Sequence, residues 1–325
     1  MPKKKTAPIF ATKSSSTEPR GILELERFTE ENITQWNLAS ENLNELEDVL
    51  YFSLEPERRR LRSELITSLQ KNDPLEFEVS NWSRIVSFEH SSEPLSCAGS
   101  IKSYGGRFNV GLELDSGTLS PWPALYIAEN FETAFREKRQ LSSDSVIEGL
   151  TPSELALMPG ENLTAVSIEG QLYRAFDMRN AKSLESISKV LRKIKMPARA
   201  KALQKKLRIS SRDLYMLRTP KQLHDAICKV NWRALPIQFG LPSQSQIIAE
   251  LIKATGFEAI LYPSSKSNGG CMAIFPELLT DGSYIKIAGN QLPMVQFSRL
   301  DATTSNNLTG FEFIEITKRG SSSSI

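Results

Sequence analysis

Residues 100–138 read SIKSYGGRFNVGLELDSGTLSPWPALYIAENFETAFREK, and this stretch decides the fold. It contains the sequence GGRFN at 105–109, the short strand-like run LYIA at 125–128 and the segment TAFRE at 133–137. Asn130 precedes the last segment and is a favoured N-cap residue, so a helix is expected to begin there. The stretch therefore predicts a glycine-rich loop, a strand and a helix in direct succession.

The side chains of this stretch suit a ligand that carries phosphate and a sugar. Gly105 and Gly106 would let the backbone pass close to a bulky anion, and Arg107 can fork two phosphate oxygens. The Tyr126 ring offers a stacking face, and the Glu137 carboxylate can stabilise a cationic sugar centre. An arginine, an aromatic ring and a carboxylate on neighbouring elements fit a dinucleotide whose glycosidic bond is broken.

Each of these residues also has a purely structural interpretation. The two glycines can form a hairpin turn, and Asn109 can cap that turn. Tyr126 can be a half-buried core residue, and Glu137 can pair with Lys138 or Arg139 on the helix surface. The residues alone leave both interpretations open.

The composition is typical of a globular protein, and the length allows one large domain or two ordinary ones. The chain has 325 residues, 40% of them hydrophobic and 24% charged, with a formal net charge of +2. Three separated cysteines and two histidines favour neither a disulfide framework nor a metal site, so no metal is expected. The start lacks the apolar region of a secretion signal, and no run approaches the roughly 18 apolar residues of a membrane span. We expect a cytoplasmic protein without a membrane contact.

Two amphipathic helices are expected before Pro74, one capped by Ser40 and one over residues 57–69. Further helices are expected from Thr151 and over residues 246–255, the latter with Gly256 as its C-cap. Trp122 is expected to anchor the loop before the LYIA strand. Strands are predicted over residues 75–79, 82–88, 125–128, 163–168, 172–178, 257–262, 271–275, 284–287 and 311–316.

Positive charge is concentrated in residues 179–212, which hold twelve Lys or Arg against one Glu. Leu184, Ile187, Leu191 and Ile194 give this segment an apolar helical stripe. The segment can be a solvated helical insertion, or it can bind an acidic protein partner or a nucleic acid. Aromatic residues that could stack on bases are absent from it until Tyr215, so direct contact with nucleic acid is not expected.

Near the C-terminal part, the strand at 257–262 is followed by the turn Pro263-Ser264-Ser265 and the strand at 271–275. Ser264 can hydrogen-bond a ligand there, although ordinary turn chemistry also explains a Ser after Pro.

The ordered set GGRFN, LYIA, TAFRE and GFEAILYPSS with CMAIF resembles the RES domain, the toxin of bacterial RES–Xre toxin–antitoxin pairs. The positions that match the family's pattern are Arg84, Arg107, Tyr126, Glu137 and Ser264. Two departures are Ile85, where an aromatic residue is common, and Phe108, where Trp is commoner. The matches cover residues 80–140 and 240–290, and no single motif among them is specific.

The resemblance implies an α+β fold of the ADP-ribosyltransferase-like type, with a split twisted sheet, a helical N-terminal part and a basic helical insertion. It implies NAD as a substrate, cleaved at the nicotinamide–ribose bond by hydrolysis or phosphorolysis, and an antitoxin partner. Glu137, Arg107 and Tyr126 would be catalytic. The NAD-binding residues would be Arg84, Gly105, Gly106, Arg107, Asn109, Tyr126 and Ser264. The alternatives are a protein ADP-ribosyltransferase of the same fold and an inactive binding module that acts through the basic insertion.

The domain layout expected on this basis has a disordered arm at 1–20 and a helical N-terminal region at 21–74. A RES-like NAD-binding domain follows at 75–316, with the helical insertion at about 179–239, and a disordered tail closes the chain at 317–325.

Overall fold

The computed structural model shows two compact units in the chain. The smaller unit comprises residues 1–57 and 195–216, and the larger comprises residues 58–194 and 217–325. The structure describes residues 30–114, 119–142, 150, 162–229, 231–233, 237, 240–289 and 295–309.

The larger unit is built on a seven-stranded sheet in the order β1-β2-β5-β4-β3-β6-β7. The β3–β4 pair is parallel, and the other described pairs are antiparallel. Because β1 also pairs with β3, the strands β1, β2, β5, β4 and β3 form a closed circuit of pairings. The strands are β1 (Leu75–Ser87), β2 (Leu125–Ala128), β3 (Leu163–Asp177), β4 (Ala259–Pro263), β5 (Gly270–Ile274), β6 (Tyr284–Ile287) and β7 (Arg299–Asp301).

The two long strands β1 and β3 each unite two strands that the sequence predicts separately. In β1 the register shifts between Val79 and Trp82, where Asn81 has φ 58°, a left-handed conformation that Asn tolerates. In β3 the join lies at Gly170, where a Cβ atom would come within 2.2 Å of the Tyr284 carbonyl oxygen of β6. The sequence predicts a gap between two strands at each of these places. The structure has a bulge there in β1 and a close approach to the β6 backbone there in β3.

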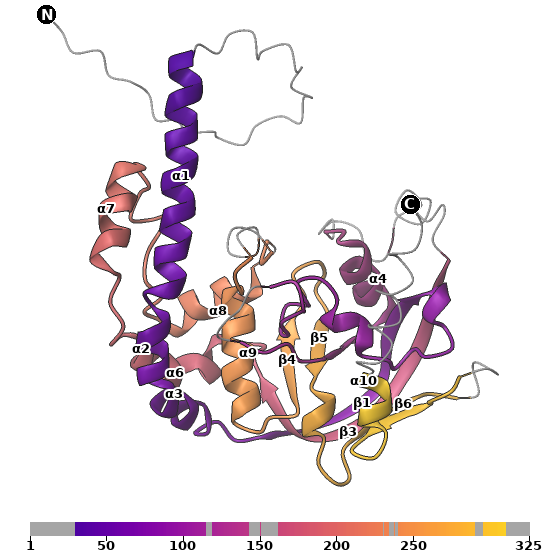
Figure 1. Cartoon of the computed structure of the whole chain (residues 1–325). Helices are drawn as coiled ribbons and strands as arrows, with labels where there is room; N and C mark the ends of the chain where they lie inside the picture. The colour runs from indigo at the N-terminus through magenta and orange to yellow at the C-terminus, as the bar shows by residue number, and fades with distance from the viewer. Residues whose placement is uncertain are drawn as a thin grey trace, which may run out of the picture. The chain divides into compact units, whose positions relative to one another are not determined.

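Helices cover the sheet of the larger unit (Figure 1). Helix α4 (Phe131–Arg139) packs against β1 and β2. Four further helices pack against one another: α3 (Arg62–Leu69), α6 (Glu185–Leu191), α8 (Pro220–Cys228) and α9 (Gln244–Ala254). The sheet's own core holds Trp82, Leu125, Ile168 and Met272, all of them buried. The described part of this unit also contains the short helices η2 (Phe88–His90), η3 (Ala98–Ile101), η4 (Ala181–Leu184), η6 (Pro276–Leu278) and α10 (Ser305–Thr309).

The smaller unit pairs α1 (Glu30–Phe52) with α7 (Ala198–Lys206). Its core is the buried Leu46, Ala200 and Leu203. An ion pair joins Arg199 to Glu45 at 2.5 Å, so charge supports the same helix pair. Helix α2 (Glu55–Arg60) follows α1 in the chain.

The predicted fold class is confirmed: the chain is α+β, with a helical N-terminal part, a twisted sheet core and helices in the basic segment. The stripe in that segment is confirmed in part, because Leu184, Ile187 and Ile194 are buried and Leu191 is half-buried. The predicted helix start at Ser40 is wrong, since α1 begins at Glu30 and Ser40 lies inside it. The helix expected over 57–69 is divided at Leu61 into α2 and α3.

Several expectations fall outside the described residues: the arm at 1–20, the helix from Thr151, the strand at 311–316 and the tail at 317–325. The other domain boundaries stay predictions. Among the described residues, no helix is long and apolar enough to cross a membrane.

Candidate active site

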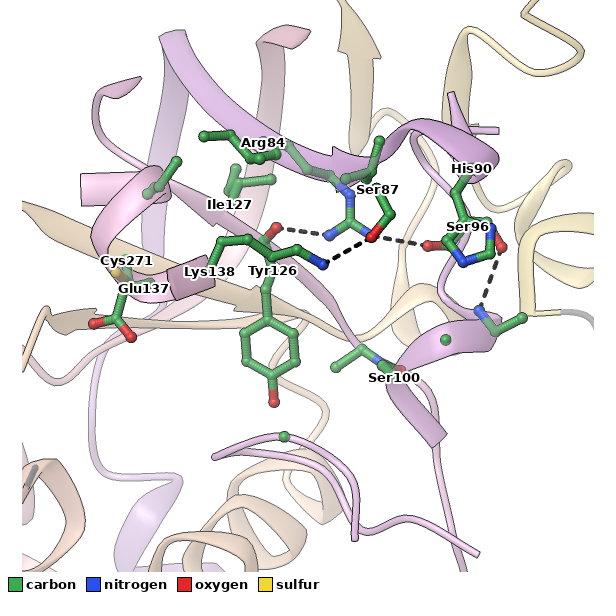
Figure 2. Close-up of a pocket in the computed structure, with 18 of the residues that line it drawn as sticks. Arg84, Ser87, His90, Ser96, Ser100, Tyr126, Ile127, Glu137, Lys138 and Cys271 are labelled. Atoms are coloured by element: carbon green, nitrogen blue, oxygen red, sulfur yellow. Dashed lines mark hydrogen bonds between the residues drawn. The ribbon is translucent and has the colours of Figure 1, made fainter. Parts of the chain in front are cut away.

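A cavity of about 780 Å³ opens in the larger unit, between the strands β1 and β2, the helix α4 and the loop that carries GGRFN (Figure 2). This volume lies within the range of roughly 300–1,000 Å³ that small-molecule sites occupy. Five of the residues predicted for the site line it: Arg84, Gly106, Arg107, Tyr126 and Glu137. These residues belong to four separate elements: β1, the GGRFN loop, β2 and α4. The fold brings them to one cavity, as the sequence analysis expects.

The GGRFN loop is held in shape by Asn109, which is fully buried. Its Oδ1 accepts hydrogen bonds from the Gly106 N–H and from the Tyr126 hydroxyl, both at 2.8 Å. Its Nδ2 donates to the carbonyls of Ser100 and Trp122. Asn109 does not line the cavity. It therefore shapes the cavity indirectly, by holding the loop and the Tyr126 hydroxyl in place.

The two glycines are required by this packing. Gly105 has φ +82°, and a Cβ atom there would come within 2.4 Å of the Asn109 carbonyl oxygen. A Cβ atom on Gly106 would lie 2.4 Å from the Tyr126 hydroxyl oxygen. The loop thus closes tightly on Tyr126, which gives the glycine pair a structural role beside the predicted role in anion binding.

Tyr126 presents its ring to the cavity and keeps its hydroxyl in the protein (Figure 2). The hydroxyl donates to Asn109 and accepts the Phe108 backbone N–H at 2.9 Å. Burial raises the pKa of the Tyr126 phenol well above its usual value. The side chain therefore offers a neutral aromatic face.

The anchoring role predicted for Trp122 is confirmed. Its indole Nε1–H donates to the Phe108 carbonyl at 3.2 Å, and the side chain is buried. Phe108 itself packs edge-on against Tyr262, with ring centroids 4.6 Å apart. Phe108 is therefore a core residue and not part of the cavity wall.

Arg107 is 6% exposed, and its guanidinium is held by the chain. Nη1 donates to the carbonyls of Ile227 and Lys229 at 3.0 and 2.9 Å, and Nη2 donates to Ser265 Oγ at 2.9 Å. The guanidinium also lies 5.7 Å from the centre of the Trp232 ring. Arg107 thus ties the GGRFN loop to the C-terminal end of α8.

Arg84 is held in a similar way on β1. Its three nitrogens donate to the carbonyls of Pro94, Ser96 and Tyr126 at 2.6, 2.9 and 2.7 Å. Burial lowers the pKa of the Arg84 guanidinium, which nevertheless keeps its proton, as arginine does in proteins. Arg84 therefore fixes the strand β2 and its neighbouring loop while its charge faces the cavity.

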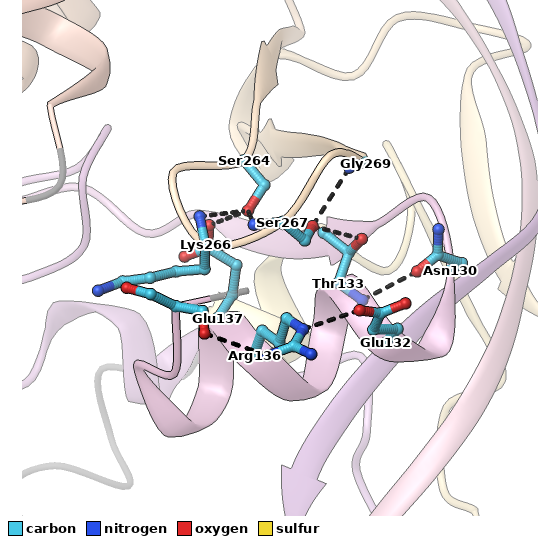
Figure 3. Close-up of polar contacts among 10 residues, drawn as sticks. Asn130, Glu132, Thr133, Arg136, Glu137, Ser264, Lys266, Ser267 and Gly269 are labelled. Atoms are coloured by element: carbon cyan, nitrogen blue, oxygen red, sulfur yellow. Dashed lines mark hydrogen bonds and ion pairs between the residues drawn. The ribbon is translucent and has the colours of Figure 1, made fainter. Parts of the chain in front are cut away.

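Glu137 on α4 is positioned by the loop between β4 and β5 (Figure 3). Its Oε1 accepts the Ser264 hydroxyl at 2.6 Å and the Ser265 backbone N–H at 3.3 Å. Ser264 Oγ in turn accepts the backbone N–H groups of Lys266 and Ser267. The loop is also fastened to α4 between Ser267 and Thr133, with their hydroxyl oxygens 2.8 Å apart.

The start of α4 follows the sequence prediction, because Asn130 Oδ1 accepts the Thr133 N–H at 2.8 Å. This cap and the Ser264 contact together fix where Glu137 lies. Ser264 therefore takes part in the site by holding the carboxylate, and it is not itself among the lining residues.

The residues that the sequence does not point to include Trp232 and Arg233, which line the cavity, and Gln246, which lies behind it. The fully buried Gln246 Nε2 donates to the carbonyls of Tyr104, Gly106 and Asn109 and so holds the GGRFN loop from α9. Ser243 and Gln246 form a capping box, a signal that marks the helix start but not this loop contact. No group of three potential metal-ligating His, Cys, Asp or Glu residues occurs in the described part of the chain.

The fold and the site define a class of protein in which a mixed sheet carries a cavity lined by arginines, a tyrosine and a glutamate. The family model for the RES domain matches residues 81–295, and the chain belongs to this family. The toxins of this family are in general enzymes that act on NAD.

Comparison with solved structures gave the M. tuberculosis MbcT–MbcA toxin–antitoxin complex, at 13% sequence identity and a TM-score of 0.40. The match covers 75% of this chain and 96% of the other. A search of curated proteins found no match. The family assignment rests on the family model alone.

Proposed function

We propose that this protein consumes NAD by breaking the bond between nicotinamide and ribose. The observation that supports this most is the pair of Glu137 and Tyr126 on one cavity, with the Glu137 carboxylate held by Ser264 at 2.6 Å. A fixed carboxylate beside an aromatic face suits a reaction in which positive charge develops on a sugar. Family membership adds NAD as the class of substrate.

In this proposal the C1′–N bond breaks and its electron pair leaves with the nicotinamide nitrogen, which becomes neutral. The Glu137 carboxylate hydrogen-bonds a ribose hydroxyl and stabilises the positive charge that develops at C1′. Tyr126 stacks on nicotinamide or its ribose. Water or phosphate then forms the new bond to C1′ and loses a proton to solvent. Because nicotinamide leaves as a neutral molecule, its departure needs no proton donor, and no histidine is required.

The diphosphate of NAD lies in this proposal near Arg84 and Arg107, beside the glycine pair Gly105 and Gly106. Both guanidiniums carry positive charge at the cavity, although many of their donors serve the protein. Asn109 and Ser264 support Tyr126 and Glu137 through the hydrogen bonds described above.

We propose further that an antitoxin neutralises the enzyme in the cytoplasm and that the basic segment binds an acidic surface of that partner. The side chains of two exposed lysines of α7, Lys201 and Lys205, have no hydrogen bond or ion pair among the contacts of the described residues. Their charge is therefore available to a partner.

Incubation of the purified chain with NAD, with and without phosphate, tests the reaction. Mass spectrometry would identify ADP-ribose as the product of hydrolysis and ADP-ribose 1″-phosphate as the product of phosphorolysis. Transfer of ADP-ribose to a protein added to the assay would instead identify a protein ADP-ribosyltransferase. Intact NAD under all these conditions would contradict the proposal and favour a binding module without turnover.

A further inference from the structure

The basic insertion contributes two residues to the wall of the cavity, Trp232 and Arg233. Trp232 is 6% exposed, so its ring is fixed by packing, whereas Arg233 is exposed. The Arg233 guanidinium lies 5.0 Å from the centre of the Trp232 ring. The Trp232 ring orients the Arg233 guanidinium through its positive charge. The ring accepts no hydrogen bond from it in this contact, so the Arg233 N–H groups remain available to a ligand.

The other cations of the cavity are mostly engaged by the protein itself. Arg84 and Arg107 each donate to three oxygens of the chain, and Lys138 donates to Ser87 Oγ at 3.3 Å. Within the described residues, Lys102 and Arg233 are the lining cations that have no hydrogen-bonded or ion-paired acceptor. An incoming anion therefore meets these two without displacing a contact.

Arg233 is the better placed of the two for a ligand that also contacts Tyr126. Its charge acts on the Tyr126 hydroxyl and, together with that of Arg107, opposes the effect of burial on the pKa of this phenol. Its planar guanidinium can hydrogen-bond two phosphate oxygens at once, whereas a lysine offers a single point of charge.

We propose that Arg233 binds the diphosphate of the dinucleotide directly, while Trp232 orients its guanidinium. This inference rests on the proposed function. Arg107 is in this view a positioning residue: it contributes charge and anchors the carbonyls of Ile227 and Lys229, just before the Trp232 turn. The basic insertion is then part of the substrate site as well as a candidate surface for a partner.

Calorimetric titration of NAD into chains that also carry Glu137→Gln measures binding without turnover. We expect Arg233→Ala to weaken NAD binding about tenfold or more and Arg233→Lys to weaken it less, because Lys keeps the charge and loses the fork. The matched control is Lys221→Ala on α8, whose side chain is 81% exposed and paired with Asp225. It should bind NAD as tightly as the parent chain.

The melting temperature of each variant checks the fold, and an exposed Arg233 predicts no change on substitution. NAD binding by the parent chain with unchanged affinity in Arg233→Ala would overturn the assignment of Arg233 and leave the proposed function standing. An equal loss in Lys221→Ala would also overturn it, since the effect would then be one of general charge. Failure of the parent chain to bind NAD would overturn both the assignment and the proposed function.

Discussion

Glu137 is the residue whose removal separates catalysis from folding most cleanly. The Glu137→Gln substitution keeps the shape of the side chain and an acceptor for Ser264, but it removes the charge that would stabilise the developing cation. We expect NAD turnover to fall about a hundredfold or more, which corresponds to roughly 3 kcal/mol, with an unchanged melting temperature. Initial rates and thermal melts measure the two effects.

The control for this substitution is Glu78→Gln, which changes an exposed carboxylate of β1 outside the cavity. It should leave turnover unaltered. A Glu137→Gln chain that consumes NAD at the normal rate would remove Glu137 from the mechanism.

The glycine pair allows a prediction on stability. In Gly106→Ala the new methyl group would lie 2.4 Å from the Tyr126 hydroxyl oxygen and 2.7 Å from Asn109 Oδ1. We expect a loss of about 1–3 kcal/mol in the free energy of unfolding, because the loop or Tyr126 must move. Urea denaturation followed by circular dichroism measures this loss.

Gly99→Ala is the matched control, because a Cβ atom at Gly99 meets no atom within 4 Å. Equal stability of the two variants would show that the GGRFN loop is looser than its contacts indicate.

For single residues, the sequence predicts which side chains line the same cavity but not which groups each of them contacts. The motif order indicates Arg84 and Arg107 as residues that bind the ligand. Their partners are instead backbone carbonyls and the Ser265 hydroxyl, from chain segments up to 158 residues away. Such contacts depend on the path of the backbone, which local residue patterns do not encode. For the same reason Trp232 and Arg233 carry no recognisable signal in the sequence.

Individual elements were predictable where a local rule decides them. The strand β2 and the start of α4 follow from a short apolar run and an Asn cap, and both lie where the sequence predicts them. The start of α1 was missed because Ser40 is a good cap by type, although the helix continues through it to Glu30. Each of β1 and β3 is one continuous strand because it pairs with the other, and the paired residues lie 76 or more positions apart in the chain (163 − 87 for Ser87 and Leu163). A local sequence pattern cannot reveal such pairing.

Helix α7 offers a test of the proposed partner contact. Replacing Lys201 and Lys205 by Glu reverses charge at two exposed positions and touches no described ion pair. We expect the association rate with the cognate antitoxin to fall at least several-fold, and to depend less steeply on salt than that of the parent chain. Surface plasmon resonance at several ionic strengths measures both quantities.

The matched control is Lys71→Glu, at an exposed position in the turn after α3 and outside the basic segment. An undiminished association rate in the α7 variant would show that these lysines are only solvated and that the partner binds elsewhere.

The molecule as a whole should lose stability in alkaline solution. Burial raises the pKa of Cys228 to about 11 and also raises the pKa values of Cys97, Cys271, Tyr126 and Tyr262. The unfolded chain releases these protons at a lower pH than the folded chain does. Above the pKa values of the unfolded chain, the folded chain therefore holds more protons than the unfolded chain. The free energy of unfolding should therefore fall as pH rises above about 8.5, by about 1.4 kcal/mol per pH unit for each proton retained.

Urea denaturation between pH 7 and 10 measures this dependence. A Cys228→Ala chain should show a shallower decline, because one of the retained protons is gone. A stability that stays flat up to pH 10 would contradict the inferred burial of these groups.

The closed circuit of strands also has a consequence for the time at which the protein becomes active during its synthesis. Strands β1, β2 and β3 leave the ribosome first, but the circuit is completed only by β4 and β5, at residues 259–274. The loop between those two strands also brings Ser264 to Glu137. A nascent chain that ends before residue 259 thus lacks both the last strands of the circuit and the loop that holds the Glu137 carboxylate. Under the proposed function, NAD consumption would therefore begin only after most of the chain has been made, and the proposed antitoxin would have that time in which to bind.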